Sequence, residues 1–398
     1  MHVLKVLHKT LSNTAAPIHQ TRLVALLAGV GALLNGAFLT VTALGRGVAS
    51  PARVKHNIKR MDRLLSNGHL QRERSLIYRT LCHYLCASHP RPVIVIDWTD
   101  IVEQERLLLI RAALAVNGRA IPLYEAVYPL KKYNTPRTHQ HFLQTLKSLL
   151  PATCTPIIVT DAGFRGPWFR AVEQLHWDWI GRIRNCVNYR LTSRQLWRYS
   201  QDLYYRAHRK VQYLGAAELS SKHPYACHLY LYKKPRCGRT AHRSVVHFAK
   251  HSNGDVFQKQ QKDPWLLATN IAPEDISAQH IIHLYGKRMQ IEECFRDLKS
   301  DRFGFGATLS RSRQVERLNI LLLIAALATV CLWWVGYAAR THGWQRHFQA
   351  NTVRDHEVLS IPFLALAVLR RTEYVLTMTE LIEIKNALLI YINQQNEV

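Results

Sequence analysis

Two aspartates follow apolar, β-branched runs in the same way. Asp97 ends the run Val-Ile-Val-Ile-Asp, and Asp161 ends the run Pro-Ile-Ile-Val-Thr-Asp. Both runs predict buried strands, and the ligands of open α/β sheets gather at the carboxyl ends of strands. An ionised carboxyl group there is costly unless it is paired or binds a metal. A single such Asp can simply cap the following turn, but two in matching contexts favour metal ligation.

A further group of polar residues lies in a segment, residues 274–300, that predicts one long helix. Tyr285, Arg288, Glu292 and Lys299 are separated by gaps that place them within about 60° of one another around a helix. Such a stripe is not a core face. The competing interpretation is a solvated stripe in which Arg288 and Glu292 form an ion pair one turn apart.

Asp97, Asp161 and Glu292 together would supply three carboxylates. Oxygen ligands of this kind suit Mg²⁺, which keeps several of its waters. Two such ions about 4 Å apart activate the attacking oxygen and stabilise the leaving oxygen of a phosphoryl transfer. Arg288 and Lys299 on the same face would then bind phosphates beside the scissile bond.

The four-residue pattern Tyr285-x2-Arg288-x3-Glu292-x6-Lys299 matches the Y-R-E-K signature of the insertion-sequence-four family of DDE transposases in every residue type and gap. The chain resembles this family over nearly its whole length and is most similar to its insertion-sequence-ten (transposon-ten) type. Further matching segments are Lys55–Leu65, Ile96–Asp100, Val159–Phe164, Pro264–Asn270, Lys287–Glu293 and Phe348–Arg354.

The resemblance implies an α/β fold with a ribonuclease-H-like mixed-sheet core and a β-rich insertion between the second Asp and the Glu. It implies that Asp97, Asp161 and Glu292 are the catalytic triad and bind two Mg²⁺ ions per active site, which we expect Mn²⁺ to replace. It also implies cut-and-paste transposition by strand nicking, hairpin formation, hairpin opening and strand transfer. Family members act as homodimers that hold two terminal inverted repeats together.

The charge of the chain agrees with a nucleic-acid partner. Lys and Arg number 53 against 27 Asp and Glu, so the formal net charge is +26. Residues 1–80 carry a net charge of +10 and residues 182–250 carry +13, while residues 351–398 carry −2. Concentrated positive charge predicts two surfaces that contact phosphates. The apolar content of 48% excludes a disordered chain.

A basic helix is predicted in the N-terminal part, starting at an N-cap Ser50 before Pro51. Its apolar residues recur on one face, and basic residues occupy the rest. The order of an apolar helix, a turn, a short helix and a basic helix is typical of a helix-turn-helix arrangement. The alternative is a solvated basic helix over a bundle. The candidate DNA contacts are Arg53, Lys55, Lys59, Arg60 and Arg63.

Composition and turn signals divide the chain into five predicted segments. They are a helical DNA-binding domain (1–88), the first part of the core (89–185), a basic β-rich insertion (186–264), the second part of the core (265–345) and a helical C-terminal region suited to dimer contacts (346–398). Asn117-Gly118 predicts a hairpin within the first part of the core.

An uncharged run of 22 residues, 318–339, is long enough to cross a membrane. One isolated span would place the two basic blocks and the C-terminal tail on opposite sides of a membrane, so we expect a buried core helix packed against the sheet and no membrane partner. The resemblance to DDE transposases strengthens that expectation.

Several further expectations complete the sequence-based interpretation. Trp98 either stacks on a DNA base extruded during hairpin formation or lines the core. Tyr285 is expected to contact DNA near the scissile phosphate. The 8 Cys residues fit no standard zinc template and indicate free thiols, so we expect a cytoplasmic bacterial protein associated with the nucleoid. The rival functions are another ribonuclease-H-like nuclease, such as a junction resolvase, and a non-catalytic DNA-binding regulator.

Overall fold

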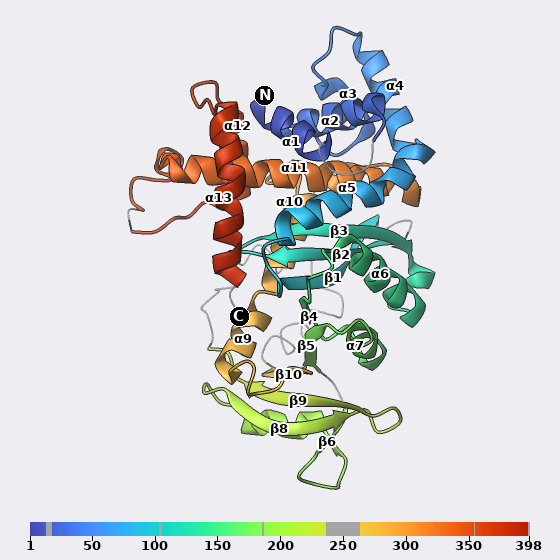
Figure 1. Ribbon diagram of the computed structural model, residues 1–398, viewed down its shortest axis with the longest axis vertical. Coiled ribbons are helices and arrows are strands. Elements are labelled where there is room, and N and C mark those ends of the chain that lie inside the picture. The colour runs from blue at the N-terminus through green and yellow to red at the C-terminus, as the bar shows by residue number, and fades with distance from the viewer. Residues whose placement is uncertain (13–17, 103–105, 185–186, 236–262, 354, 397–398) are drawn as a thin grey trace, which may run out of the picture. The chain divides into compact units, whose positions relative to one another are not determined.

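The computed structural model describes residues 1–398 except 13–17, 103–105, 185–186, 236–262, 354 and 397–398 (Figure 1). It consists of two compact units. The first unit combines Met1–Pro156 with Lys287–Glu397, and the second is Ile157–Gly286. The second unit is therefore an uninterrupted segment, and the chain returns to the first unit after it.

The N-terminal part of the first unit is helical, as predicted. Thr40 caps the third helix, because its hydroxyl accepts a hydrogen bond from the Ala43 amide at 3.1 Å. The predicted start of the basic helix is wrong by three residues: Ser50 accepts from the Ala52 amide in a turn, and the helix begins at Val54. The helices are α1 (His2–Ser12), α2 (Gln20–Leu34), α3 (Val41–Gly47), α4 (Val54–Leu65) and α5 (Gly68–Cys86).

Three antiparallel strands follow: β1 (Val93–Val102), β2 (Leu107–Ala115) and β3 (Ala120–Pro129). The β2–β3 hairpin turns at Asn117-Gly118, as predicted, and Gly118 adopts the left-handed conformation (φ +69°) that this turn requires. Helix α6 (Pro136–Leu149) follows a short 3-10 turn, η1 (Leu130–Lys132). Strands β2 and β3 are almost continuously buried.

The position of Asp97 differs from the sequence-based prediction. It does not end its strand, because β1 continues for five residues beyond it. What ends at Asp97 is the buried half of the strand: Val93–Ile96 are fully buried, and most of the following residues are half-buried or exposed. The apolar run therefore marks where β1 leaves the core rather than where its hydrogen bonding stops.

The long apolar run forms α11 (Val315–Thr341), which is the core helix of the first unit. It is long and apolar enough to cross a membrane, but 94% of its most apolar window is buried inside the protein. It packs on β3, where Asn319 accepts a hydrogen bond from the Val127 amide at 3.1 Å, and on α2 (Figure 1). The expectation of a core helix packed on the sheet is confirmed.

The remaining elements of the first unit are helical, including the C-terminal region. Helix α12 (Ile361–Leu369) contacts α11 through a close approach at Gly336, where a Cβ atom would lie 2.0 Å from the Ile361 carbonyl oxygen. These elements are α10 (Met289–Lys299), η4 (Ala307–Leu309), η5 (Trp344–His347), α12 (Ile361–Leu369) and α13 (Met378–Asn396).

The second unit is built on strands. Strand β4 (Ile157–Thr160) runs parallel to β5 (Asp178–Ile183). Strand β10 (Trp265–Thr269) pairs antiparallel with β5 on one side and with β9 (Tyr225–Tyr232) on the other. The described part of the predicted insertion is rich in strands, as expected. The elements are β4 (Ile157–Thr160), α7 (Gly166–Glu173), β5 (Asp178–Ile183), β6 (Asn188–Leu191), β7 (Arg198–Tyr199), η2 (Ser200–Arg206), β8 (Gln212–Leu219), β9 (Tyr225–Tyr232), β10 (Trp265–Thr269) and α9 (Ala278–Gly286).

The chain order of the core is three antiparallel strands, a helix, a strand, a helix and a parallel strand. This is a mixed α/β, ribonuclease-H-like fold with a β-rich insertion, as predicted. The prediction of one continuous helix over residues 274–300 is wrong. Helices α9 and α10 are separate, because Lys287 and Arg288 form a turn between them.

Candidate active site

The guanidinium group of Arg288 lies between two of the predicted catalytic carboxylates. Its Nη2 atom is 2.6 Å from Oε1 of Glu292, and its Nη1 atom is 3.8 Å from Oδ2 of Asp97. Asp97 also accepts a hydrogen bond from the Trp98 amide at 2.8 Å. Arg288 precedes the first residue of α10 and Glu292 lies in its first turn, so the start of this helix faces β1.

The other end of α10 contacts the same strand. The ammonium group of Lys299 donates a hydrogen bond to the hydroxyl of Thr99 at 2.6 Å. Thr99 is two residues beyond Asp97, and side chains two apart on a strand share a face. The structure thus brings Asp97, Arg288, Glu292 and Lys299 together in the first unit.

A row of charged residues crosses the sheet beneath α10. Asp97 is paired in register with Arg111 of β2, and Arg111 with Glu125 of β3. Arg111 donates to Glu125 through Nε at 2.8 Å and Nη2 at 2.6 Å, and both side chains are at most 2% exposed. The third nitrogen of Arg111, Nη1, donates to the main-chain oxygen of Cys294 in α10 at 3.1 Å.

Sequence reasoning missed Arg111 and Glu125. The available signal was a single charge in each of two otherwise apolar strands joined by a tight hairpin. Arg111 also lies 4.9 Å from the ring centre of Phe295 in α10. This cation–π contact is a second interaction between Arg111 and the helix. The buried pair therefore fixes the helix that carries Glu292.

Trp98 lies half-buried in an aromatic group. Its ring centre is 5.3 Å from that of Tyr133 and 6.0 Å from that of Tyr128. Its indole nitrogen donates to Nε2 of His139 at 3.3 Å. Burial lowers the pKa of His139 to about 4, so the ring is neutral at pH 7 and can accept this bond.

Asp161 and Tyr285 belong to the second unit. Asp161 follows the last residue of β4, as predicted, and its Oδ1 atom accepts a hydrogen bond from the Gly163 amide at 2.7 Å. Tyr285 is only 2% exposed and stands edge-on to Trp265, with ring centres 4.8 Å apart. Within the described residues, no three His, Cys, Asp or Glu side chains form a ready metal site.

The basic residues predicted on α4 project from the first unit. Arg53, Lys55, Lys59 and Arg63 are exposed, and Arg60 is half-buried. The opposite face of the helix is buried through Asn57, Met61, Leu64 and Leu65. The helix is therefore amphipathic, with its charge directed to solvent.

Comparison with known proteins gives a family match. The family model of the transposase DDE domain matches residues 88–329, which is more than half of the chain. No curated protein matches the sequence. Among solved structures, the chain is similar to a piggyBac transposase in a synaptic complex with hairpin DNA, with a TM-score of 0.38 and 10% identity, over 98% of this chain and 78% of that chain. A similarity of that size adds nothing to the assignment. On the family match, the chain belongs to the transposase DDE domain family, whose members bind DNA and cut and join it with divalent metal ions.

Proposed function

We propose that the protein is a cut-and-paste DDE transposase of the insertion-sequence-four family, of the insertion-sequence-ten type. The observation that carries this proposal is the position of Arg288 between Asp97 and Glu292, with Lys299 bound to Thr99 beside them. A solvated stripe would pair Arg288 with Glu292 alone. Here Arg288 and Lys299, two residues of the Y-R-E-K pattern, both contact strand β1, which carries Asp97.

Asp97, Asp161 and Glu292 would hold two Mg²⁺ or Mn²⁺ ions. The donor set fits these ions because it consists only of carboxylate oxygens. The pairing of Asp97 and Glu292 with one guanidinium group also supports a site that favours a cation. When bound, the metals would activate the attacking oxygen and stabilise the leaving oxygen of each phosphoryl transfer.

The remaining site residues bind and orient the DNA in this proposal. Arg288 would bind a phosphate in place of its carboxylate partners, because its planar donor pair suits a phosphate. Lys299 holds a second phosphate as a point charge. Tyr285 is buried and acts by positioning its neighbours. Trp98 stacks on an extruded base or stays in its aromatic group.

Helix α4 binds the terminal inverted repeats through Arg53, Lys55, Lys59, Arg60 and Arg63, and the protein acts as a homodimer that joins two ends. It works in the bacterial cytoplasm at the nucleoid, on double-stranded DNA and not on a membrane. The exposure of four of these five basic side chains supports the DNA contact.

The test uses the full chain and the DNA that flanks its gene, with Mg²⁺. We expect nicks and hairpins at imperfect inverted repeats, followed by joining to a target plasmid. Asp97→Ala should abolish cleavage and leave repeat binding intact. Cleavage that persists in this variant contradicts the assignment of the triad. Cleavage of paired ends without joining favours a resolvase-like nuclease, and binding without cleavage by the unaltered protein favours a regulator.

A further inference from the structure

A cavity of about 530 Å³ opens in the second unit directly after Asp161. Ala162 and Phe164, which follow Asp161 on the loop, form part of its wall. Among the described residues that line it, every charged side chain is basic. These side chains are Arg165, Arg170, Arg182, Arg184 and Lys222.

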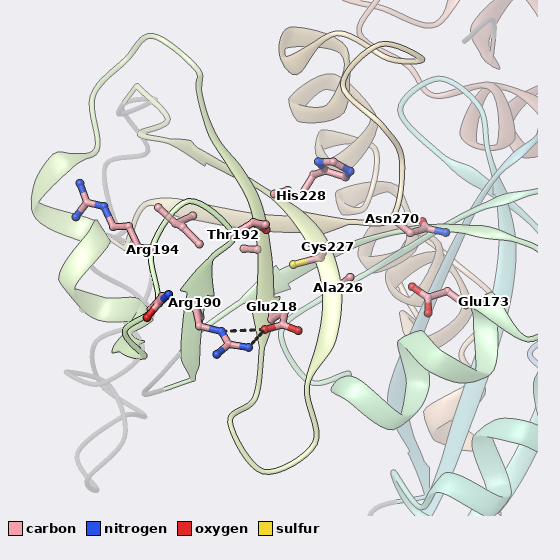
Figure 2. A pocket seen from close by; sticks show the side chains of 13 residues that line it. Glu173, Arg190, Thr192, Arg194, Glu218, Ala226, Cys227, His228 and Asn270 are labelled. Atoms are coloured by element: carbon pink, nitrogen blue, oxygen red, sulfur yellow. Dashed lines mark hydrogen bonds and ion pairs between the residues drawn. The ribbon is translucent and has the colours of Figure 1, made fainter.

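A second cavity of about 660 Å³ in the same unit provides a contrast (Figure 2). It is lined by Arg190 and Arg194 but also by Glu173 and Glu218. Arg190 donates to Glu218 at 2.9 Å, and Figure 2 shows these two side chains paired. Its positive charge is balanced within its own wall, whereas the positive charge beside Asp161 is not.

Within the described part of the chain, two of the arginines beside Asp161 donate to main-chain oxygens. Arg182 donates to the main-chain oxygens of Asp263 and Pro264, at 3.1 and 3.3 Å, and these carry no formal charge. Arg170 donates to the main-chain oxygen of His223 at 3.1 Å. Arg184 forms an ion pair with Asp263, whose Oδ2 atom is 3.9 Å from its Nε atom. Burial lowers the pKa of Arg182, because its charge is partly removed from water.

The wall also contains three aromatic rings. Phe164, Phe169 and Tyr225 contribute to it, and Arg170 lies 5.6 Å from the ring centre of Tyr225. The approach of Tyr225 requires a glycine at position 166, where a Cβ atom would lie 2.9 Å from the tyrosine ring. Guanidinium groups above aromatic rings are the combination with which proteins bind single-stranded nucleic acid.

We propose that this cavity binds an unpaired DNA strand beside the scissile phosphate, with backbone phosphates on its arginines and Lys222 and a nucleoside against its aromatic wall. The volume suits one nucleotide and not a duplex, because pockets for whole small ligands span about 300–1,000 Å³. This inference rests on the proposed function, both for its ligand and for the place of Asp161 at the active site.

The test measures the binding of DNA by the full chain in the presence of a metal chelator, so that no cleavage occurs. The probes are (dT)30 and a 30-base-pair duplex of mixed sequence, and the dissociation constant is followed from 50 to about 300 mM KCl. In the variant Arg165→Gln/Lys222→Gln, both altered side chains are exposed, so the fold should be retained. We expect the salt slope on (dT)30 to fall by about 1.4, since each phosphate that is no longer neutralised lowers the slope by about 0.7.

The matched control removes two arginines from exposed positions of the same unit outside the cavity, as Arg194→Gln/Arg209→Gln. Its slope on (dT)30 should change by less than half as much. Equal changes of the salt slope in the two variants, or a change seen only with the duplex, would overturn the inference. DNA binding would then depend on positive charge spread over the whole unit. Arg182→Gln provides a second variant and should weaken (dT)30 binding at least about tenfold at 100 mM KCl, because it removes a charge-assisted hydrogen bond to a phosphate.

The two proposals fail separately. If the Arg165→Gln/Lys222→Gln variant binds (dT)30 with an unchanged salt slope while the unaltered protein cleaves element ends normally, only this inference is contradicted. Strand binding through the cavity by a protein that never cleaves DNA contradicts only the proposed function.

Discussion

Arg111 and Glu125 form a buried ion pair at the centre of the β1–β3 sheet, with Nη2 and Oε1 2.6 Å apart. Both side chains are at most 2% exposed, and Arg111 also donates to the main-chain oxygen of Cys294, two residues after Glu292. The pair therefore links the sheet that carries Asp97 to the helix that carries Glu292.

Replacing Arg111 with Met should destabilise the first unit strongly. The substitution leaves the Glu125 carboxylate buried without its cation, which costs about 3–5 kcal/mol in other proteins. The double variant Arg111→Met/Glu125→Leu should recover most of that stability, because no uncompensated charge remains. Urea unfolding of the two variants and the unaltered chain measures both effects. Equal stability of the single and double variants would contradict this account.

The stability of the first unit should fall below pH 6.5 through His139. Its pKa is lowered to about 4 by burial, whereas an unfolded His titrates near 6.5. Between these values the unfolded state binds the proton and the folded state does not, so stability decreases as pH falls through this window. The decrease amounts to at most about 3 kcal/mol.

The pH dependence is checked by thermal unfolding at pH 7.5 and pH 5 in the unaltered chain and in His139→Gln. The glutamine side chain does not titrate and can still accept a hydrogen bond from the Trp98 indole. We therefore expect a smaller drop in unfolding temperature in this variant. An unchanged drop would assign the pH dependence to other groups.

Much of the fold follows from local patterns in the sequence. The apolar β-branched runs before Asp97 and Asp161 predicted strands, and Asn117-Gly118 predicted the hairpin, because each of these signals depends on neighbouring residues only. The run from 318 to 339 was correctly interpreted as a core helix, since one uncharged span did not suit so basic a chain.

The parts of the site that sequence reasoning missed depend on contacts between distant segments. The row of Asp97, Arg111 and Glu125 exists only in one strand register, which the apolar pattern of two fully buried strands does not define. The turn at Lys287 and Arg288 interrupts a segment whose residues mostly favour a helix, apart from Gly286. The four-residue stripe is thus divided at this turn, and Tyr285 lies on the first of the two helices.

Replacing Gly163 with Ala should slow DNA cleavage without weakening DNA binding. A Cβ atom at this position would lie 3.0 Å from Oδ1 of Asp161, which must then shift. A displacement of about 1 Å at a reacting group lowers rates by up to about 100-fold, so the shift of a few tenths of an ångström expected here should cost less than that. Single-turnover cleavage measures the change. Gly68→Ala is the matched control, because its Cβ atom would meet only Arg72, at 4.0 Å. Similar rates in the two variants would contradict a catalytic role for the position of Asp161.

Replacing Arg288 with Gln should tighten metal binding and impair cleavage at the same time. In the absence of metal, the guanidinium group occupies the space between Asp97 and Glu292 and competes for their charge. Its removal should lower the dissociation constant for Mn²⁺ in the DNA-free protein about threefold to tenfold, equivalent to about 1 kcal/mol for a partly exposed ion pair. Cleavage should fall, because the variant cannot hold the phosphate that Arg288 would bind.

Isothermal titration with Mn²⁺ and single-turnover cleavage measure the two effects on the same preparation. The matched control is Arg296→Gln on the same helix, where the arginine is 59% exposed and pairs with Glu293 instead. This control should leave both quantities unchanged within about twofold, since surface pairs contribute little. An unaltered Mn²⁺ affinity in Arg288→Gln would mean that the arginine does not compete at the metal site. Its closeness to Asp97 and Glu292 would then serve only to position helix α10.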